Sequence, residues 1–231
     1  MHVLAVVVVT GPHALEPLAG VPLVVRSARA ALGVPGVGRV VVVTPADQTG
    51  AVARECAGEP VTVPVGTAAS VHPQAHAGQR TGAAEGDGWI TPGESDVVLV
   101  LDAVRPLVPA ALVERVVDAV RAGHRAVVPV LPLSDTVKLV DGDGTVTGTP
   151  DRSGLRVVQT PQGFDPAALG PAGLRAVLAA AALDPAHAWT GVAGPAHTVE
   201  GDPLAFPVLD PWQRDLAHAT VTAAPDVRNV T

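Results

Sequence analysis

The chain contains five short apolar runs, rich in Val, with amphipathic segments between them. The runs are continuous rather than alternating, which is typical of strands buried on both faces of a parallel sheet. The segments between them carry apolar residues at helical spacing. This alternation predicts right-handed crossovers and a doubly wound, mostly parallel α/β sheet of the Rossmann-like kind. The expected strands cover residues 3–9, 39–43, 61–65, 96–101 and 126–131, and the expected helices cover 22–32, 47–57 and 109–122.

Three segments depart from this alternation. Residues 138–147 show the pattern strand, Gly-containing turn, strand, which predicts a hairpin. An isolated hairpin is marginal in water, so we expect an arm over 137–155 that docks on a second subunit. Residues 73–93 are polar and Gly-rich and predict a long surface loop, and residues 220–231 have no clear period. The whole chain, 1–231, is expected to form a single domain around this arm.

Composition narrows the class of protein. The 231 residues are 48% hydrophobic but only 2% aromatic, and there is no Tyr, so Val, Leu and Ala must form the core. The formal net charge is −7, with 15 Lys and Arg residues and no basic stripe. This charge pattern argues against nucleic acid as a partner, because phosphate backbones are bound by clustered cations.

The single cysteine and the apolar start of the chain indicate in which cellular compartment the protein is expected. Cys56 alone excludes an internal disulfide and a Cys-based zinc site, and its place in an expected helix favours a buried structural thiol. The apolar N-terminus lacks a basic segment and a cleavage site, so it predicts a first strand rather than a signal peptide. No apolar run reaches the ~20 residues that span a bilayer. We therefore expect a cytoplasmic protein without a membrane partner.

Residues suited to chemistry gather in the second half of the chain. They follow the fourth and fifth expected strands and flank the hairpin. The segments are LDAVRP (101–106), PVLPLSDTVK (129–138), TPDRSGL (149–155), QTPQGF (159–164) and, further on, GDPLAF (201–206). In this order they closely resemble the 2-C-methyl-D-erythritol 4-phosphate cytidylyltransferase family, most strongly over residues 96–180.

The resemblance implies a reaction and a set of substrate-binding residues. The family transfers a cytidylyl group from CTP to methylerythritol phosphate, releases pyrophosphate and uses Mg²⁺, so the resemblance implies Mg²⁺ as cofactor if the chain is active. It places Asp102 and Arg105 at the head of the sheet and Thr160 in the pocket wall. The hairpin resembles the family's dimer arm, whose flanking Thr136 and Arg152 contact the sugar phosphate in the neighbouring subunit's site. Arg suits that role because its planar fork binds phosphate bidentately.

The chain departs from the family at the nucleotide side of the site. The Gly-rich triphosphate loop after the first strand is missing, and His13 occupies the position of the family lysine. Gly66 and Ser70 are what remains of the nucleotide-binding loop. Thr190 matches a substrate-binding threonine but lacks the two acidic residues that follow it in the family, and Pro207 replaces a second lysine. No metal ligands are assigned. Losing such contacts commonly costs ~100-fold or more in rate for each, so these departures predict impaired catalysis.

Taken singly, each of these residues also has a purely structural interpretation: Asp102 as a turn cap, His13 as a loop histidine in solvent, the arginines as surface ion pairs. Three functions therefore stay open. The chain is an active cytidylyltransferase with an unusual CTP site, a nucleotidyltransferase for another substrate, or a non-catalytic homologue. The homologue would act as a homodimer, as the partner of an intact cytidylyltransferase in a heterodimer, or as a binder of a small phosphorylated ligand.

Overall fold

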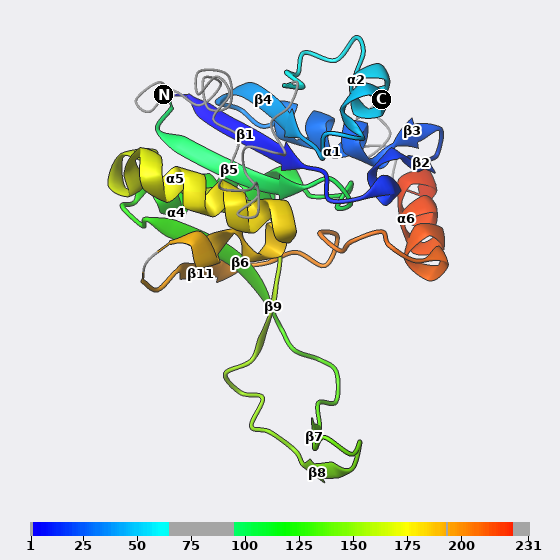
Figure 1. Ribbon diagram of the computed structural model, residues 1–231, viewed down its shortest axis with the longest axis vertical. Helices are drawn as coiled ribbons and strands as arrows, with labels where there is room; N and C mark the ends of the chain where they lie inside the picture. Colours follow the sequence, from blue (N-terminus) through cyan, green and yellow to red (C-terminus); the bar gives the residue numbers. More distant parts are fainter. Residues whose placement is uncertain (1, 65–94, 193, 224–231) are drawn as a thin grey trace, which may run out of the picture.

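The computed structural model describes residues 2–64, 95–192 and 194–223, which form a twisted sheet covered by helices, with a long arm projecting from one side (Figure 1). The expected surface loop at 73–93, Gly66 and Ser70 lie outside the described residues. The strand order is β11-β6-β10-β5-β1-β4, and β9 also pairs with β6. The strands are β1 Val3–Val8, β4 Val37–Val43, β5 Val97–Asp102, β6 Ala126–Pro132, β9 Arg156–Val158, β10 Gln162–Phe164 and β11 His197–Glu200.

The strand pairings confirm the predicted mostly parallel, doubly wound sheet. β1 runs parallel to β4 and β5, and β11 runs parallel to β6. β10 lies between β5 and β6 and is antiparallel to both. The helices are α1 Leu23–Leu32, α2 Thr49–Glu55, α4 Ala110–Arg121, α5 Pro166–Leu183 and α6 Pro211–Ala223, with two 3-10 helices, η1 Pro12–Leu15 and η2 Pro185–Gly191.

The central strands are apolar throughout because both of their faces are covered. Along β1, Val3, Ala5 and Val7 belong to one core cluster, which includes residues of α1, α4 and α6. The alternate residues, Leu4 and Val6, belong to a second cluster, which includes residues of α5 and η2. Figure 1 shows α5 in front of the sheet and α1 behind it. A strand with a core on each side cannot alternate polar and apolar residues, which explains the continuous runs.

One expectation about the chain's elements is wrong. The strand expected at 61–65 is reduced, in its described part, to a single bridge between Thr62 and Val41. Pro60 and Pro64 flank this bridge, and a proline has no N–H to continue a ladder. At the C-terminus, where the sequence showed no clear period, the described residues up to Ala223 form the end of α6.

The predicted hairpin is present at the end of the arm. It consists of β7 Leu139–Val140 and β8 Val146–Gly148, joined by the Gly-containing turn. The side chains of Leu139, Val140 and Val146 are all more than half exposed. The hairpin therefore has no core of its own. Two short hairpin strands, β2 Pro17–Leu18 and β3 Val21–Pro22, precede α1.

By length and composition alone, α5 could span a membrane. In the fold, however, α5 is apolar because it packs against a face of the sheet. Leu174, Val177 and Ala181 belong to the second core cluster, against the sheet. Gly170, with φ of 63°, and Pro171 kink the helix near its start. The kink and the packing are those of a core helix that covers a sheet face.

Cys56 is buried beside α2, as expected for a structural thiol. Burial raises the pKa of its thiol to about 11, and the nearby carboxylates of Glu59 and Glu55 act in the same direction. Since the thiolate is the reactive form, this cysteine is protected at neutral pH by both its burial and its protonation.

The close packing of β10 against α4 can be tested by a substitution at Gly163. A Cβ at this position would lie 2.5 Å from Val116 Cγ1 and 2.8 Å from Val120 Cγ2, both in the body of α4. We expect Gly163→Ala to lower the free energy of unfolding by about 1–3 kcal/mol, the usual cost of overpacking, in urea denaturation. Gly11→Ala is the matched control, because its Cβ would meet nothing within 4 Å. Equal stability of the two variants would contradict this packing.

Candidate active site

The candidate site lies at the carboxyl end of β5, where the antiparallel β10 interrupts the parallel order of the sheet. Asp102 is the last residue of β5. Its Oδ1 accepts a hydrogen bond from the backbone N–H of Val104 at 3.1 Å, and its own N–H donates to Thr160 Oγ1 at 3.2 Å. The structure therefore brings Asp102 and Thr160 together, as the resemblance implied. Ligands of doubly wound sheets bind at this kind of edge.

Arg105 occupies the same corner and is almost completely buried. Its Nε lies 3.6 Å from Asp102 Oδ2, and its Nη1 donates a hydrogen bond to the carbonyl oxygen of Ala205. Among the described residues, Nε has no hydrogen-bond partner. The guanidinium thus joins the end of β5 to the segment that follows β11, and one of its donors lies in the corner without an acceptor.

Burial dominates the electrostatics of this pair. Loss of solvent raises the pKa of the Asp102 carboxyl, although Val104 N–H and the Arg105 charge act in the opposite direction. Loss of solvent likewise lowers the pKa of Arg105, against the attraction of Asp102. The negative charge of Asp184 acts to raise both pKa values. Perturbed ionisable groups held in a low-dielectric corner are a common property of functional sites.

Gln159 holds the segment 201–208 against this corner. Its Oε1 accepts from Asp202 N–H at 2.9 Å, and its Nε2 donates to the carbonyl oxygens of Asp202, at 2.8 Å, and Ala205, at 3.4 Å. Gly201 is required for this approach, because a Cβ there would lie 3.0 Å from the carbonyl oxygen of Val130 and closer still to the Gln159 amide. The buried amide of Gln159 therefore helps to fix the backbone that accepts Arg105, together with the main-chain bonds of Gly201 to Val130 and of Val208 to Val104.

Gln162 performs the same task for η2. Its Nε2 donates to the carbonyl oxygen of Ala186 at 2.6 Å, and its Oε1 accepts from Trp189 N–H at 2.8 Å. Sequence reasoning singled out Thr160 in this stretch and missed the two glutamines beside it. Their signal was available: two amide side chains close to a buried strand need partners, and they find them on the segment 201–205 and on η2.

Asp184 is a second residue that the sequence interpretation missed. It is the N-cap of η2, where its Oδ1 accepts from Ala186 N–H at 2.8 Å and its Oδ2 lies 2.8 Å from His187 Nδ1. Its negative charge acts to raise the pKa values of Asp102 and Arg105. An Asp followed by Pro is a typical helix start, so the pair Asp184-Pro185 was the available signal for a helical turn just before Thr190.

Thr190 and His13 have partners close to them in the chain, and no hydrogen bond or ion pair joins either to Asp102 or Arg105 among the described residues. Thr190, at the end of η2, is exposed and donates to the carbonyl oxygen of His187 at 2.7 Å. His13, in η1 after β1, is exposed, with Nδ1 at 2.9 Å from Glu16 Oε1. Glu16 also pairs with Arg214 of α6. The imidazole at the family lysine position thus faces a carboxylate of its own chain.

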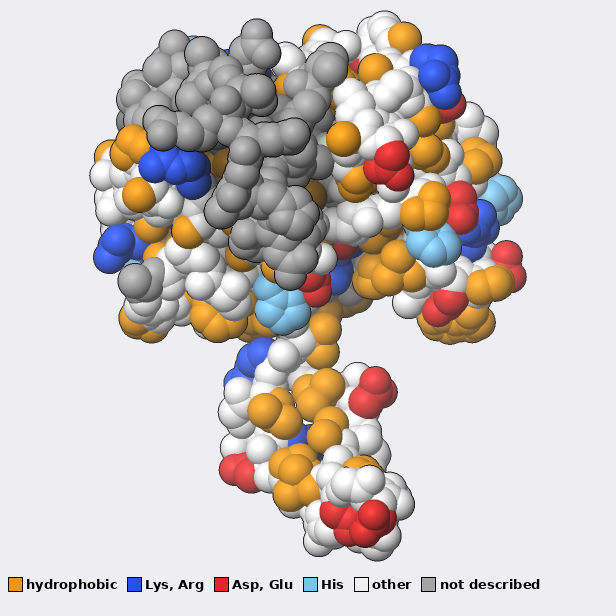
Figure 2. Space-filling model, in the orientation of Figure 1, with side chains coloured by type: hydrophobic (Ala, Val, Ile, Leu, Met, Phe, Trp, Pro, Cys, Tyr) orange, Lys and Arg blue, Asp and Glu red, His pale blue; other side chains and the backbone are white. Residues whose placement is uncertain are grey.

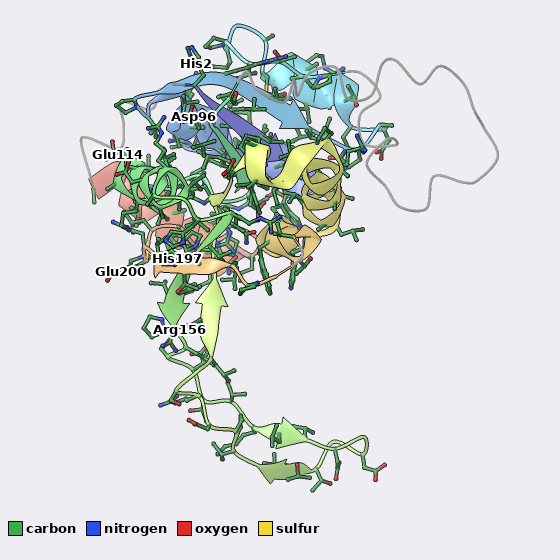
Figure 3. All side chains as sticks on the ribbon, turned by 90° about the vertical axis from the view of Figure 1, so that its left-hand side faces the viewer. His2, Asp96, Glu114, Arg156, His197 and Glu200 are labelled. Atoms are coloured by element: carbon green, nitrogen blue, oxygen red, sulfur yellow. The ribbon has the colours of Figure 1, made fainter. Side chains whose placement is uncertain are left out.

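Thr136 and Arg152 are not brought to Asp102 within the chain. Both belong to the arm, which projects away from the body (Figure 1; in Figure 3, Arg156 marks where the arm leaves the sheet). Arg152 Nη1 donates to the carbonyl oxygens of Ser134, at 3.2 Å, and Asp135, at 2.9 Å, which ties the two sides of the arm together. Thr136 is exposed.

The described residues contain no group of three or more His, Cys, Asp or Glu side chains suited to a metal ion. The two carboxylates nearest the corner are already engaged. Asp102 is bound by Val104 N–H and Arg105, and Asp184 by Ala186 N–H and His187. Mg²⁺ prefers free carboxylate oxygens in octahedral geometry. The described part of the chain does not fit a Mg²⁺ ion held by protein ligands alone.

The mixed, mostly parallel sheet with helices on both faces and a polar corner at its carboxyl edge defines a Rossmann-like nucleotidyltransferase fold. The family model of "IspD: 2-C-methyl-D-erythritol 4-phosphate cytidylyltransferase" matches residues 7–223. The chain belongs to this cytidylyltransferase family.

Relatives and solved structures agree with this assignment. The chain is 43% identical over 210 residues to the 2-C-methyl-D-erythritol 4-phosphate cytidylyltransferase of Nocardia farcinica, covering 90% of this chain and 84% of that protein. It is 38% identical to that of Rhodococcus jostii, over 91% of this chain and 87% of the relative. The Thermus thermophilus enzyme of the same name superposes with a TM-score of 0.66 and 28% identity, covering 96% of this chain and 100% of that one. The Anaerococcus prevotii synthase, at 18% identity and a TM-score of 0.69, shares the fold over 96% of this chain and 98% of that one.

Gln162 gives a direct test of how η2 is held at the site. Gln162→Leu keeps the side chain's approximate size but leaves the carbonyl of Ala186 and the N–H of Trp189 without partners. Because an unsatisfied buried polar group costs about 1–3 kcal/mol, we expect a loss of stability in this range. We also expect faster hydrogen exchange at the Trp189 amide, with the amides of β1 unchanged as the internal control. Unchanged exchange at Trp189 would contradict the assigned role.

Proposed function

We propose that the chain catalyses the family reaction, the transfer of a cytidylyl group from CTP to 2-C-methyl-D-erythritol 4-phosphate with release of pyrophosphate. The observation that carries this proposal is the buried corner of Asp102 and Arg105, which Thr160 and Gln159 hold at the carboxyl edge of the sheet. The corner occurs in a chain that is 43% identical to a relative named for this activity.

The chemistry requires positioning more than covalent participation. An oxygen of the sugar phosphate attacks the α-phosphorus of CTP in line, and the bond to the departing pyrophosphate breaks as the new P–O bond forms. Asp102 would accept hydrogen bonds from substrate hydroxyls. Arg105 would act as a positioning residue, since its guanidinium already joins Asp102 to Ala205.

We further propose that the active form is a homodimer in which the arm completes the neighbouring site. The arm's Thr136 and Arg152 would supply the hydroxyl and the guanidinium that bind the sugar phosphate there. Support comes from the arm itself: it projects from the body, and its apolar hairpin is exposed. The guanidinium of Arg152 is already held by two carbonyl oxygens, so little side-chain freedom is lost when phosphate binds.

A second candidate function is that of a non-catalytic homologue, and the nucleotide side of the site favours it. His13 pairs with Glu16 instead of presenting a free cation, and Pro207 carries no charge where the family has a lysine. Such a chain would pair with an intact cytidylyltransferase, lending its arm residues to the partner's site, or bind a small phosphorylated ligand. We make two further predictions: turnover requires Mg²⁺ if the chain is active, and the protein is cytoplasmic under either function.

The decisive assay measures pyrophosphate release from CTP and methylerythritol phosphate in the presence of Mg²⁺, with an EDTA control. We expect turnover that is abolished by EDTA. If a well-folded sample releases no pyrophosphate and gives no heat with CTP and Mg²⁺ in calorimetry, the catalytic proposal fails. Native mass spectrometry after co-expression with an intact family member then tests the second candidate, which fails if only homodimers form.

Arg152 and Arg156 provide a matched pair for the arm's role. Arg152 lies in the arm and Arg156 at its root, in β9; both are exposed, and their side chains bond to nearby backbone carbonyls. Because a lost phosphate contact commonly costs ~100-fold in rate, we expect Arg152→Ala to lower kcat/KM by about that factor. Arg156→Ala should leave kcat/KM within about threefold of wild type, and neither change should alter the thermal midpoint noticeably. Equal losses in the two variants would remove Arg152 from the site.

A further inference from the structure

The chain returns to the candidate site at the end of α5. β10 ends at Phe164, which pairs with Val98 and lies opposite Ala126, near the amino ends of β5 and β6. Helix α5 therefore starts at the amino edge of the sheet and crosses in front of it (Figure 1). The 3-10 helix η2 follows α5 closely and contacts β5, β6 and β10. η2 thus lies beside the corner formed by Asp102 and Arg105, and we call its side of the corner the rim.

The rim carries a histidine that a carboxylate holds in place. His187 Nδ1 lies 2.8 Å from Asp184 Oδ2, and Asp184 Oδ1 accepts a hydrogen bond from Ala186 N–H at 2.8 Å. An ionised carboxylate only accepts, so Nδ1 carries a proton and Nε2 is the ring nitrogen left for a ligand. Among the described residues Nε2 has no hydrogen-bond partner, and the side chain is 64% exposed. The imidazole is therefore oriented by its own chain and open to a ligand.

The backbone of η2 is fixed on both sides of His187. Gln162 on β10 bonds to the carbonyl oxygen of Ala186 and to the N–H of Trp189. Thr190 Oγ1 donates to the carbonyl oxygen of His187 at 2.7 Å. These bonds hold the short helix against the sheet, so little conformational freedom is lost when the imidazole meets a ligand.

The segments that border the corner are short of positive charge. They are residues 102–108, 159–164, 184–191 and 201–208. Their ionisable side chains are Asp102, Arg105, Asp184, His187 and Asp202. When the imidazole is neutral, the carboxylates outnumber the single guanidinium. A phosphate brings more negative charge, so binding it here requires a further cation. His187 is the one other side chain in these segments that can become positive.

The elements packed on η2 bring few other charges to His187. β5 ends in Asp102, α5 carries Arg175, and β6 and β10 have no ionisable side chain. The charge of Asp184 acts to raise the pKa of both Asp102 and Arg105, so η2 and the corner interact electrostatically. A proton on His187 would offset the charge of Asp184 and reduce its repulsion of an anionic ligand.

We propose that His187, held by Asp184, is a substrate-binding residue whose protonated Nε2–H donates a hydrogen bond to a phosphate oxygen at the rim. The inference rests on the proposed function and adds to it a contact that depends on protonation, at a residue that the resemblance does not assign. The rim lies near the arm root, because Gln159, which leads to β10, directly follows β9. Figure 2 shows histidine, acidic and basic side chains together on the body just above the arm.

Both substrates of the proposed reaction carry phosphate, and calorimetry distinguishes them. Methylerythritol phosphate and CTP with Mg²⁺ are titrated separately, each in two buffers with different heats of ionisation. We expect the wild-type protein to take up a proton when it binds the phosphate that His187 contacts. His187→Gln keeps a hydrogen-bond donor but cannot gain a charge. It should lose this proton uptake and bind that ligand about tenfold more weakly at about pH 6.5.

A matched control and a second variant complete the test. His218→Gln makes the same change at an exposed histidine of α6, which no hydrogen bond or ion pair joins to the corner among the described residues, and it should behave as wild type. His187→Lys keeps a positive charge as the pH rises. It should retain its affinity at about pH 8.5, where the wild-type imidazole has lost its proton. Because His187 is mostly exposed, both variants at this position should fold, as thermal unfolding will show.

The outcomes separate this inference from the proposed function. Equal affinity and equal proton uptake in wild type and His187→Gln, for both ligands, overturn the inference alone. Weaker binding with unchanged proton uptake also overturns it, because His187 would then act only on the local structure. Proton uptake that disappears in His187→Gln supports the inference even if the protein releases no pyrophosphate, a result that would defeat the catalytic proposal. A wild-type protein that binds neither ligand overturns both.

Discussion

The arrangement of the site depends on the need of two buried amide side chains for hydrogen-bond partners. Gln162 is the first residue of β10, the strand that separates β5 from β6, and Gln159 directly follows β9; both are buried, so water cannot satisfy them. Gln159 takes its partners from the segment that follows β11, and Gln162 takes its partners from η2. Both segments are thereby drawn to the end of β5. The bonds from Gln159 act together with those of Gly201 N–H to Val130 and of Val208 N–H to Val104, which hold the same segment where Ala205 meets Arg105.

In the corner that results, the attraction between two opposite charges is opposed by the cost of burying them. Asp102 and Arg105 attract each other, yet both have lost most of their contact with water, and burial acts against the charged form of each. Such pairs contribute little net stability because desolvation offsets the attraction. A buried pair at the open end of a strand is therefore better explained by a task in binding than by a contribution to folding.

The sheet was predictable because its signal in the sequence is strong and local. Four of the five expected strands are confirmed, since a continuous Val-rich run buried on two faces has few alternatives. The fifth failed at Thr62, where flanking prolines limit pairing to one bridge. Asp102 and Thr160, which the resemblance assigned to the site, are joined by a hydrogen bond. Asp184 was missed because its influence on Asp102 crosses a long stretch of chain, which no local pattern encodes.

Gln159 also joins two distant parts of the chain into one mechanical unit. It follows the arm root directly, and its side chain bonds to Asp202 and Ala205 in the site segment. Gly201, at the start of that segment, lies so close to the same amide that a side chain there would displace it. A force on the arm is therefore transmitted through Gln159 to the backbone that receives Arg105.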